Sequence, residues 1–85
     1  MSPTEIALIG IYKGPTVPLA EISQRYLGMD PNYAQKLAKL NTLPFPTFRL
    51  TESPKAPLMV STVDLARQID WQRAIAMKSW ENSQV

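Results

Sequence analysis

The sequence predicts a mainly α-helical fold with a small β-hairpin, a winged helix-turn-helix that has an extra N-terminal helix and a long C-terminal helix. Three observations favour this class. Residues 17–40 contain two short amphipathic segments around a glycine, which is the outline of a helix-turn-helix. Residues 47–60 contain two short apolar stretches separated by a turn, as in a wing. Residues 61–80 form one longer helical segment.

Length and composition limit the possible functions. The 85 residues provide for one small core, so we expect a single domain over 1–85. The chain contains no cysteine and no histidine, which excludes a disulfide framework, a zinc finger and the nucleophilic pairs that need either residue. Its apolar runs fall short of the roughly 20 residues of a spanning helix, and no basic region precedes them as in a signal peptide. We expect a cytoplasmic protein that is not an enzyme and takes no cofactor or metal.

The first element is expected to be a helix. Ser2, Pro3 and Glu5 form a compact helix start with the residue order of a capping box. Gly14 and Pro15 are expected to stop the segment. The apolar run between them also suits a strand, which is the competing interpretation. Either element would need to pack on another one.

The predicted helix-turn-helix follows. Val17-Pro18 begins its first helix and Gly28 ends it. Asp30 is the expected cap of the second helix, with Pro31 at the first helical position. The buried face of this second helix is expected to hold Ala34, Leu37, Ala38 and Leu40. The opposite face carries Asn32, Tyr33, Gln35, Lys36 and Lys39.

The wing and the last helix complete the chain. Residues 47–51 alternate as a half-buried strand with Arg49 outward, 52–57 form a turn with Ser53 and Lys55, and 58–60 form the second strand. Ser61 or Thr62 is expected to cap the final helix.

This arrangement predicts binding to double-stranded DNA. In such a module the second helix, here about 31–40, enters the major groove and the hairpin reaches the backbone or the minor groove. Amides can pair with adenine, and lysines with phosphates or guanine. The net charge is only +2, but residues 32–55 hold four basic residues against Glu52 alone. The candidate DNA-binding residues are Asn32, Tyr33, Gln35, Lys36, Lys39, Arg49, Ser53 and Lys55. For Tyr33, stacking on a sugar and packing in the core both remain open.

The last helix carries apolar residues on two faces, more than a small core can cover. We expect self-association there, into a homodimer or a cooperative oligomer on DNA, through Trp71, Ile75 and Trp80. Arg67 and Arg73 would reach either DNA or a second protomer.

The order and spacing of several short stretches resemble the pyocin activator protein family (PrtN-like). These stretches are Val17-Pro18-Leu19 with Glu21, Tyr26-Leu27-Gly28, Pro31 with Ala34 and Lys36, Leu43-Pro44-Phe45-Pro46, Ser53, Lys55, Val60, Asp64-Leu65-Ala66 and Ile69-Asp70. The resemblance covers roughly residues 5–76. It implies sequence-specific DNA binding and activation of phage- or bacteriocin-like genes, with RNA polymerase as a possible partner. At Trp71 the chain departs from the basic residue expected after Ile-Asp.

Two other functions stay open. The Leu-Pro-x-Pro segment and the following Asp-Leu pair are also similar, more loosely, to excisionase and MerR-like winged helices. That similarity implies an architectural factor that bends DNA for a recombinase. The other alternative is a protein-interaction module without DNA binding, acting through the apolar first helix and the two tryptophans.

Overall fold

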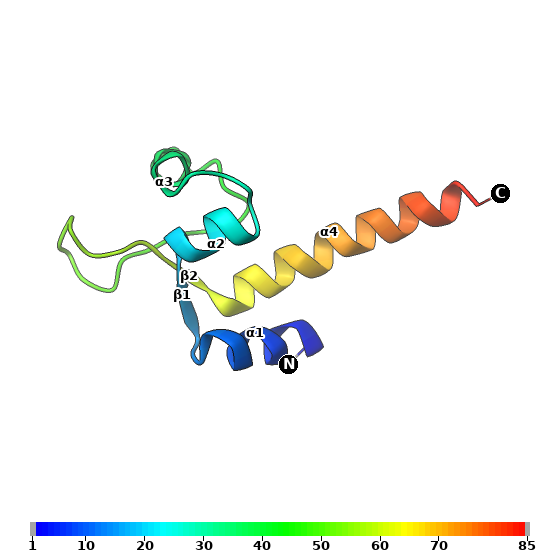
Figure 1. Cartoon of the computed structure of the whole chain (residues 1–85), viewed down its shortest axis with the longest axis horizontal. Coiled ribbons are helices and arrows are strands. Elements are labelled where there is room, and N and C mark those ends of the chain that lie inside the picture. The colour runs from blue at the N-terminus through cyan, green and yellow to red at the C-terminus, as the bar shows by residue number, and fades with distance from the viewer. Residues whose placement is uncertain (1, 85) are drawn as a thin grey trace.

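The structure is a computed structural model that describes residues 2–84. Four helices and two strands follow one another as α1 (Pro3–Tyr12), β1 (Thr16–Pro18), α2 (Leu19–Arg25), α3 (Pro31–Lys39), β2 (Met59–Ser61) and α4 (Thr62–Asn82). The predicted class, mainly helical with a small antiparallel β element, is confirmed. Figure 1 shows α2 and α3 above the strands, α1 and α4 below and beside them, and the wing segment at the opposite end from the tip of α4.

Two of the helix starts follow local sequence chemistry. The Ser2 hydroxyl accepts a hydrogen bond from the Glu5 amide at 3.1 Å, and the Ser61 hydroxyl accepts one from the Val63 amide at 3.2 Å. Asp30 occupies the cap position of α3, but its side chain makes no capping hydrogen bond. The predicted cap position is therefore confirmed, without the hydrogen bond that such a residue can make. Lys13, with a φ of 56°, ends α1 one residue before Gly14.

The sheet joins distant parts of the chain. β1 and β2 are antiparallel, with Val17 opposite Val60 and both side chains fully buried. Leu19 donates to the Leu58 carbonyl at 2.8 Å, and Thr62 donates to the Pro15 carbonyl at 2.8 Å. Bonded pairs alternate with non-bonded pairs in an antiparallel ladder, so Pro18 falls at a non-bonded position where its missing N–H costs nothing.

The wing segment pairs at a single point. Phe48 and Met59 exchange two backbone hydrogen bonds, of 3.0 and 2.7 Å, and form an isolated bridge on the other edge of β2. In this register the next bonded pairs would place Pro57 opposite Leu50 and Pro46 opposite Ser61. Neither proline has an N–H to donate, so each of these pairs could form only one of its two bonds, which disfavours extension of the ladder in both directions. The strand predicted over 47–51 is therefore a loop held by one bridge.

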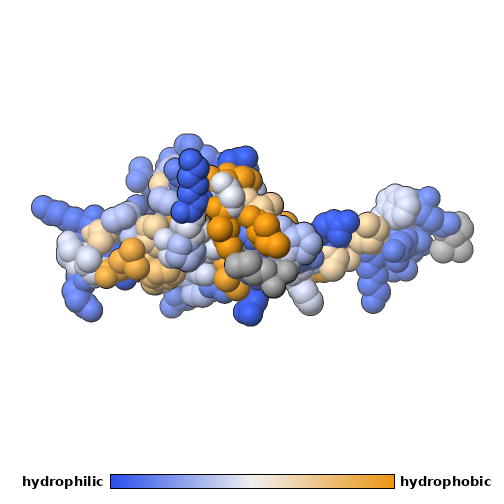
Figure 2. All heavy atoms as spheres, turned by 90° about the horizontal axis from the view of Figure 1, so that it is seen from below, coloured by the Kyte–Doolittle hydropathy of each residue, from blue (hydrophilic) through white to orange (hydrophobic). Residues whose placement is uncertain are grey.

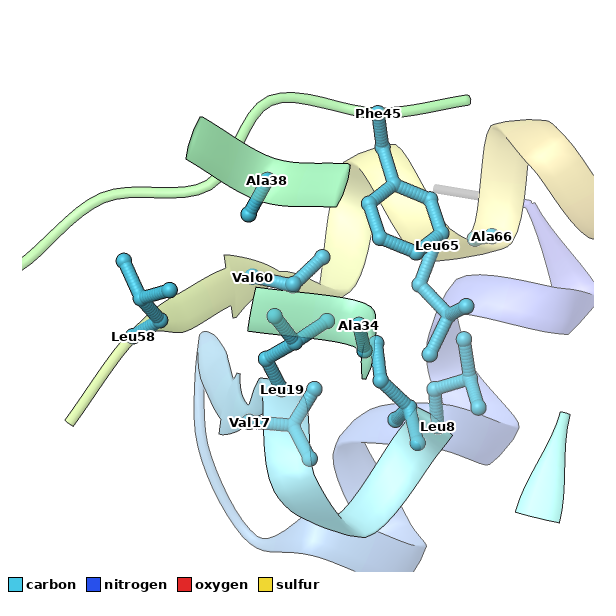
Figure 3. Close-up of a cluster of buried hydrophobic side chains, with 11 residues drawn as sticks. Leu8, Val17, Leu19, Ala34, Ala38, Phe45, Leu58, Val60, Leu65 and Ala66 are labelled. Atoms are coloured by element: carbon cyan, nitrogen blue, oxygen red, sulfur yellow. The ribbon is translucent and has the colours of Figure 1, made fainter. Parts of the chain in front are cut away.

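The core lies where the strands, α2 and the first half of α4 meet. Figure 3 shows Val17, Leu19 and Val60 together, with Phe45 directed toward Leu65. Ala34 and Ala38 face this cluster from α3, and Leu8 faces it from α1. The Thr4 hydroxyl donates to the Asp70 carboxylate and fixes the start of α1 against α4.

Two further features involve α1, where Tyr12 packs against the edge of this core. The Tyr12 hydroxyl is buried without a hydrogen-bond partner among residues 2–84, and burial raises the pKa of Tyr12 above its ordinary value. On the outer side of α1, Ile6 and Ile11 are exposed, and Figure 2 shows the hydrophobic surface that gathers over this helix. The expectation that this first segment packs on another element is confirmed: α1 packs against α4 through Leu8 and Thr4, and its outer side stays uncovered.

Candidate nucleic-acid interface

Small residues pack one side of helix α3 against α2, which leaves its polar side facing outward. Ala34 is fully buried and Ala38 nearly so, and Leu37 is half-buried. Leu40 was expected on this buried side but is 70% exposed, because α3 ends at Lys39 and Leu40 is its cap residue. The helix lies at the edge of the molecule, and in Figure 1 it is seen end-on at the top.

The outward side chains of α3 form one continuous surface. At 100° per residue, four of the predicted positions fall within an arc of about 100°. These are Asn32, Gln35, Lys36 and Lys39, and all four are exposed. The arc combines two amides and two ammonium groups and contains no acidic residue. It can donate and accept hydrogen bonds and attract anions.

Tyr33 lies at the edge of this arc. Its side chain is 53% exposed, so of its two open alternatives, packing in the core is excluded. It lies about 60° farther round the helix than Lys36, next to the exposed Leu40. The ring thus lies on the same side of the molecule as the arc, but not within it.

The wing residues are placed by local hydrogen bonds. Arg49 donates from Nε to the Ala56 carbonyl at 3.0 Å, which ties the two limbs of the wing together. The Lys55 amide donates to the Ser53 hydroxyl at 3.2 Å and shapes the tip. The Arg49, Ser53 and Lys55 side chains are exposed. The Ser53 hydroxyl is therefore occupied in part by the turn itself.

A hollow joins α3 to the wing. It measures about 400 Å³ and lies between the end of α3, where Lys39 lines it, and the wing, where Arg49 and Thr51 line it. Glu52 also lines it and is the acidic residue among those that do. The sequence predicted the two basic residues separately but not the hollow, because the path of the chain between α3 and the wing, through Asn41 and Thr47, has no regular periodicity.

The three residues predicted for self-association do not all lie on one side of α4; they are Trp71, Ile75 and Trp80. Trp71 lines a hollow with Pro44, Pro46 and Arg67, whereas Trp80 lines another with Arg73 and Met77. Helical periodicity places Ile75 near Trp71 and places Trp80 on the opposite side of α4. All three are exposed, at 64%, 48% and 60% in chain order. Arg67 and Arg73 divide between the same two hollows.

The structure also limits other kinds of site. Among residues 2–84, no three carboxylates come close enough together to hold a metal ion. None of the described helices is long and apolar enough to cross a membrane.

Comparison with known proteins gives the family. The family model of the pyocin activator protein PrtN matches residues 4–76, which include α2, α3, the segment 47–60 and most of α4. The chain belongs to the pyocin activator protein family. This family comprises regulatory proteins and not enzymes. The match ends within α4, so Met77 and Trp80 lie outside the matched residues. No curated protein and no solved structure matches the chain.

Proposed function

We propose that this pyocin activator family member is a sequence-specific DNA-binding transcription activator of phage- or bacteriocin-like genes. The observation that carries the proposal is the exposed arc of α3, which holds amides and lysines without an acidic residue and lies beside a basic wing. Such a surface suits a groove that is lined by phosphates and presents base edges. The family match supports a regulatory role for it.

In this proposal α3 enters the major groove. Asn32 lies in the first turn of the helix, where the recognition helices of such modules contact bases, and its amide can pair with adenine. Gln35 lies one turn further and can do the same. Lys36 and Lys39 flank the amides and contact phosphates or guanine, and Tyr33 stacks on a sugar at the edge.

The wing contacts the DNA backbone or the minor groove in the same complex. Arg49 uses Nε for the Ala56 carbonyl, which leaves its two terminal nitrogens for a phosphate. Lys55 at the tip adds a second charge, and Ser53 can contribute its hydroxyl. The protein is proposed to bind as a dimer or cooperative oligomer that associates through the exposed half of α4.

The test begins with selection of bound sequences from random double-stranded DNA. Binding of the selected duplex is then measured by fluorescence anisotropy for Asn32→Ala and for Lys36→Ala. Asn32→Ala should cost about 1–3 kcal/mol on the selected sequence and relax the preference at one base position. Lys36→Ala should weaken selected and unselected duplexes alike, because phosphates carry no sequence information.

Glu21→Ala serves as the control, since this exposed residue lies on α2, outside the arc and the wing. It should leave both affinities within twofold of the native protein. Failure of the selection to enrich any sequence would contradict sequence-specific binding. If Asn32→Ala lowers the affinity equally for all duplexes, Asn32 does not contact a base.

A further inference from the structure

We infer that the second half of α4 pairs with the same segment of a second copy, antiparallel, through the stripe Arg73, Ala76, Met77 and Trp80. The inference deepens the proposed self-association and rests on it. It assigns the contact to one face of the helix and sets its register. Trp71 and Ile75, on the other face, are then not part of this contact.

The stripe lies on the same side of α4 as the residues that pack into the core in the first half of the helix. Leu65, Ala66 and Ile69 pack into the body, and helical periodicity carries their direction on to Arg73, Ala76 and Trp80. Beside them, α1 covers α4 as far as Asp70, where Thr4 bonds to it. From residue 71 to 82 every residue of α4 is exposed. Figure 1 shows this half projecting from the body.

An isolated half-helix of this length needs a partner. Residues 71–82 are 12 of the 21 residues of α4, and a helix of about 12 residues is marginal in water without tertiary contacts. Within this segment the stripe forms a hollow of about 340 Å³, lined by Arg73, Ala76, Met77 and Trp80. Its lining is apolar apart from one guanidinium.

The stripe is complementary to itself in one orientation. When two copies run antiparallel about the point between Ala76 and Met77, Arg73 of one copy lies at the level of Trp80 of the other. Both positions are central on the stripe, so the guanidinium can stack on the indole, and this happens twice. Glu81 of the second copy lies one residue beyond and can pair with the same Arg73. A two-fold contact requires this kind of self-complementarity.

The free length of α4 gives the same register independently. The uncovered segment runs from residue 71 to 82, and its midpoint also falls between Ala76 and Met77. In this register the end of the partner's α4 comes level with residue 71, next to the point where α1 starts. The second copy therefore packs on the part of α4 that α1 leaves exposed, and the two do not occupy the same surface. A shift by one turn would collide with α1 or leave Trp80 uncovered.

The pairing is expected to be modest without DNA. The stripe offers one tryptophan, worth about 150–250 Å² of burial, and stays well below the roughly 800 Å² per partner of a standard interface. Two copies on adjacent DNA sites would gain from a high effective concentration. Because the buried area is small, we expect a weak dimer in solution that becomes more stable when both copies bind DNA.

The experiment uses cysteine cross-linking of the full chain, which has no native cysteine. Met77→Cys lies beside the two-fold axis and should form a disulfide dimer under mild oxidation at least fivefold faster than Ile75→Cys. The control residue has similar exposure, 48% against 41%, but lies on the other face. In the Met77→Cys chain, Arg73→Glu should slow the reaction at least fivefold. Adding Glu81→Arg to that variant should restore at least half of the rate.

Each outcome decides the inference. Faster cross-linking of Ile75→Cys, or equal slow rates for both, would overturn the assigned face. A failure of Glu81→Arg to restore the rate would overturn the antiparallel register, because a parallel pair brings Arg73 near Arg73. Circular dichroism confirms that each variant keeps its helices. DNA binding, measured in parallel, separates a failure here from a failure of the proposed function.

Discussion

At the residue scale, two positions show how the backbone selects a residue type. Lys13 and Gly28 both adopt left-handed conformations, with φ values of 56° and 64°. Gly28 was expected to stop a helix, and it lies in the turn between α2 and α3, three residues after α2 ends at Arg25. The left-handed conformation of Lys13 was not predicted, because lysine has no preference for it. The neighbouring Gly14-Pro15 is the stronger signal for the end of a helix.

These two positions give predictions of opposite sign. Gly28→Ala should destabilise the protein by about 1–2 kcal/mol, the cost of a left-handed conformation for a residue with a Cβ. A Cβ at this position meets nothing within 4 Å, so the cost is conformational alone. Lys13→Gly should stabilise it by up to about 1 kcal/mol for the same reason. Urea denaturation of both variants measures this, and changes of the same sign would contradict it.

The capping residues show what local sequence can and cannot predict. Ser2 and Ser61 make the expected hydrogen bonds, since their hydroxyls need only the amides of the following turn. Asp30 occupies the cap position of α3 but makes no such bond, although Ser2, which also precedes a proline, does. A residue type therefore predicts the start of a helix better than the contact that its side chain makes.

At the scale of elements, the helices were predictable, and so was the strand expected over 58–60, which is present as β2 at Met59–Ser61. The helices carry their own periodicity and proline signals, and α2, α3 and α4 lie near their expected places. β1 was missed because its three residues pair with β2, which lies more than forty residues further along the chain. The wing was expected as a hairpin, although Pro46 and Pro57 remove the N–H groups that a longer ladder would need.

The wing therefore depends on side-chain support. Arg49→Ala removes the bond from Nε to the Ala56 carbonyl and should speed hydrogen exchange of the Phe48 and Met59 amides about fivefold, which equals about 1 kcal/mol. The same variant should weaken DNA binding, since it also loses a positive charge. Lys55→Ala, the matched control, should weaken DNA binding without changing exchange at the bridge. Unchanged exchange in Arg49→Ala would show that the bridge does not need this bond.

At the scale of the whole molecule, the proposed functions occupy separate regions. The molecule measures 53 × 26 × 17 Å, with the wing at one end of the long axis and the tip of α4 at the other (Figure 1). α3 and the wing face the proposed DNA, and the free half of α4 carries the proposed contact with a second copy. Sequence periodicity predicted the residues of the α3 arc, and for α4 it predicted Trp71, Ile75 and Trp80, of which the proposed contact keeps Trp80 alone. It could not show how much of α4 the body leaves uncovered, because that depends on where the start of α1 packs against α4, at Thr4 and Asp70.

The central claim is that the basic surface of α3 and the wing binds DNA. The most direct test is the affinity of the full chain for a single-site duplex over a range of salt concentrations. If Lys36, Lys39, Arg49 and Lys55 each neutralise one phosphate, the logarithm of affinity should fall against the logarithm of salt with a slope near −3.6. Lys36→Ala should reduce that slope by about 0.9. A slope near zero would contradict the account.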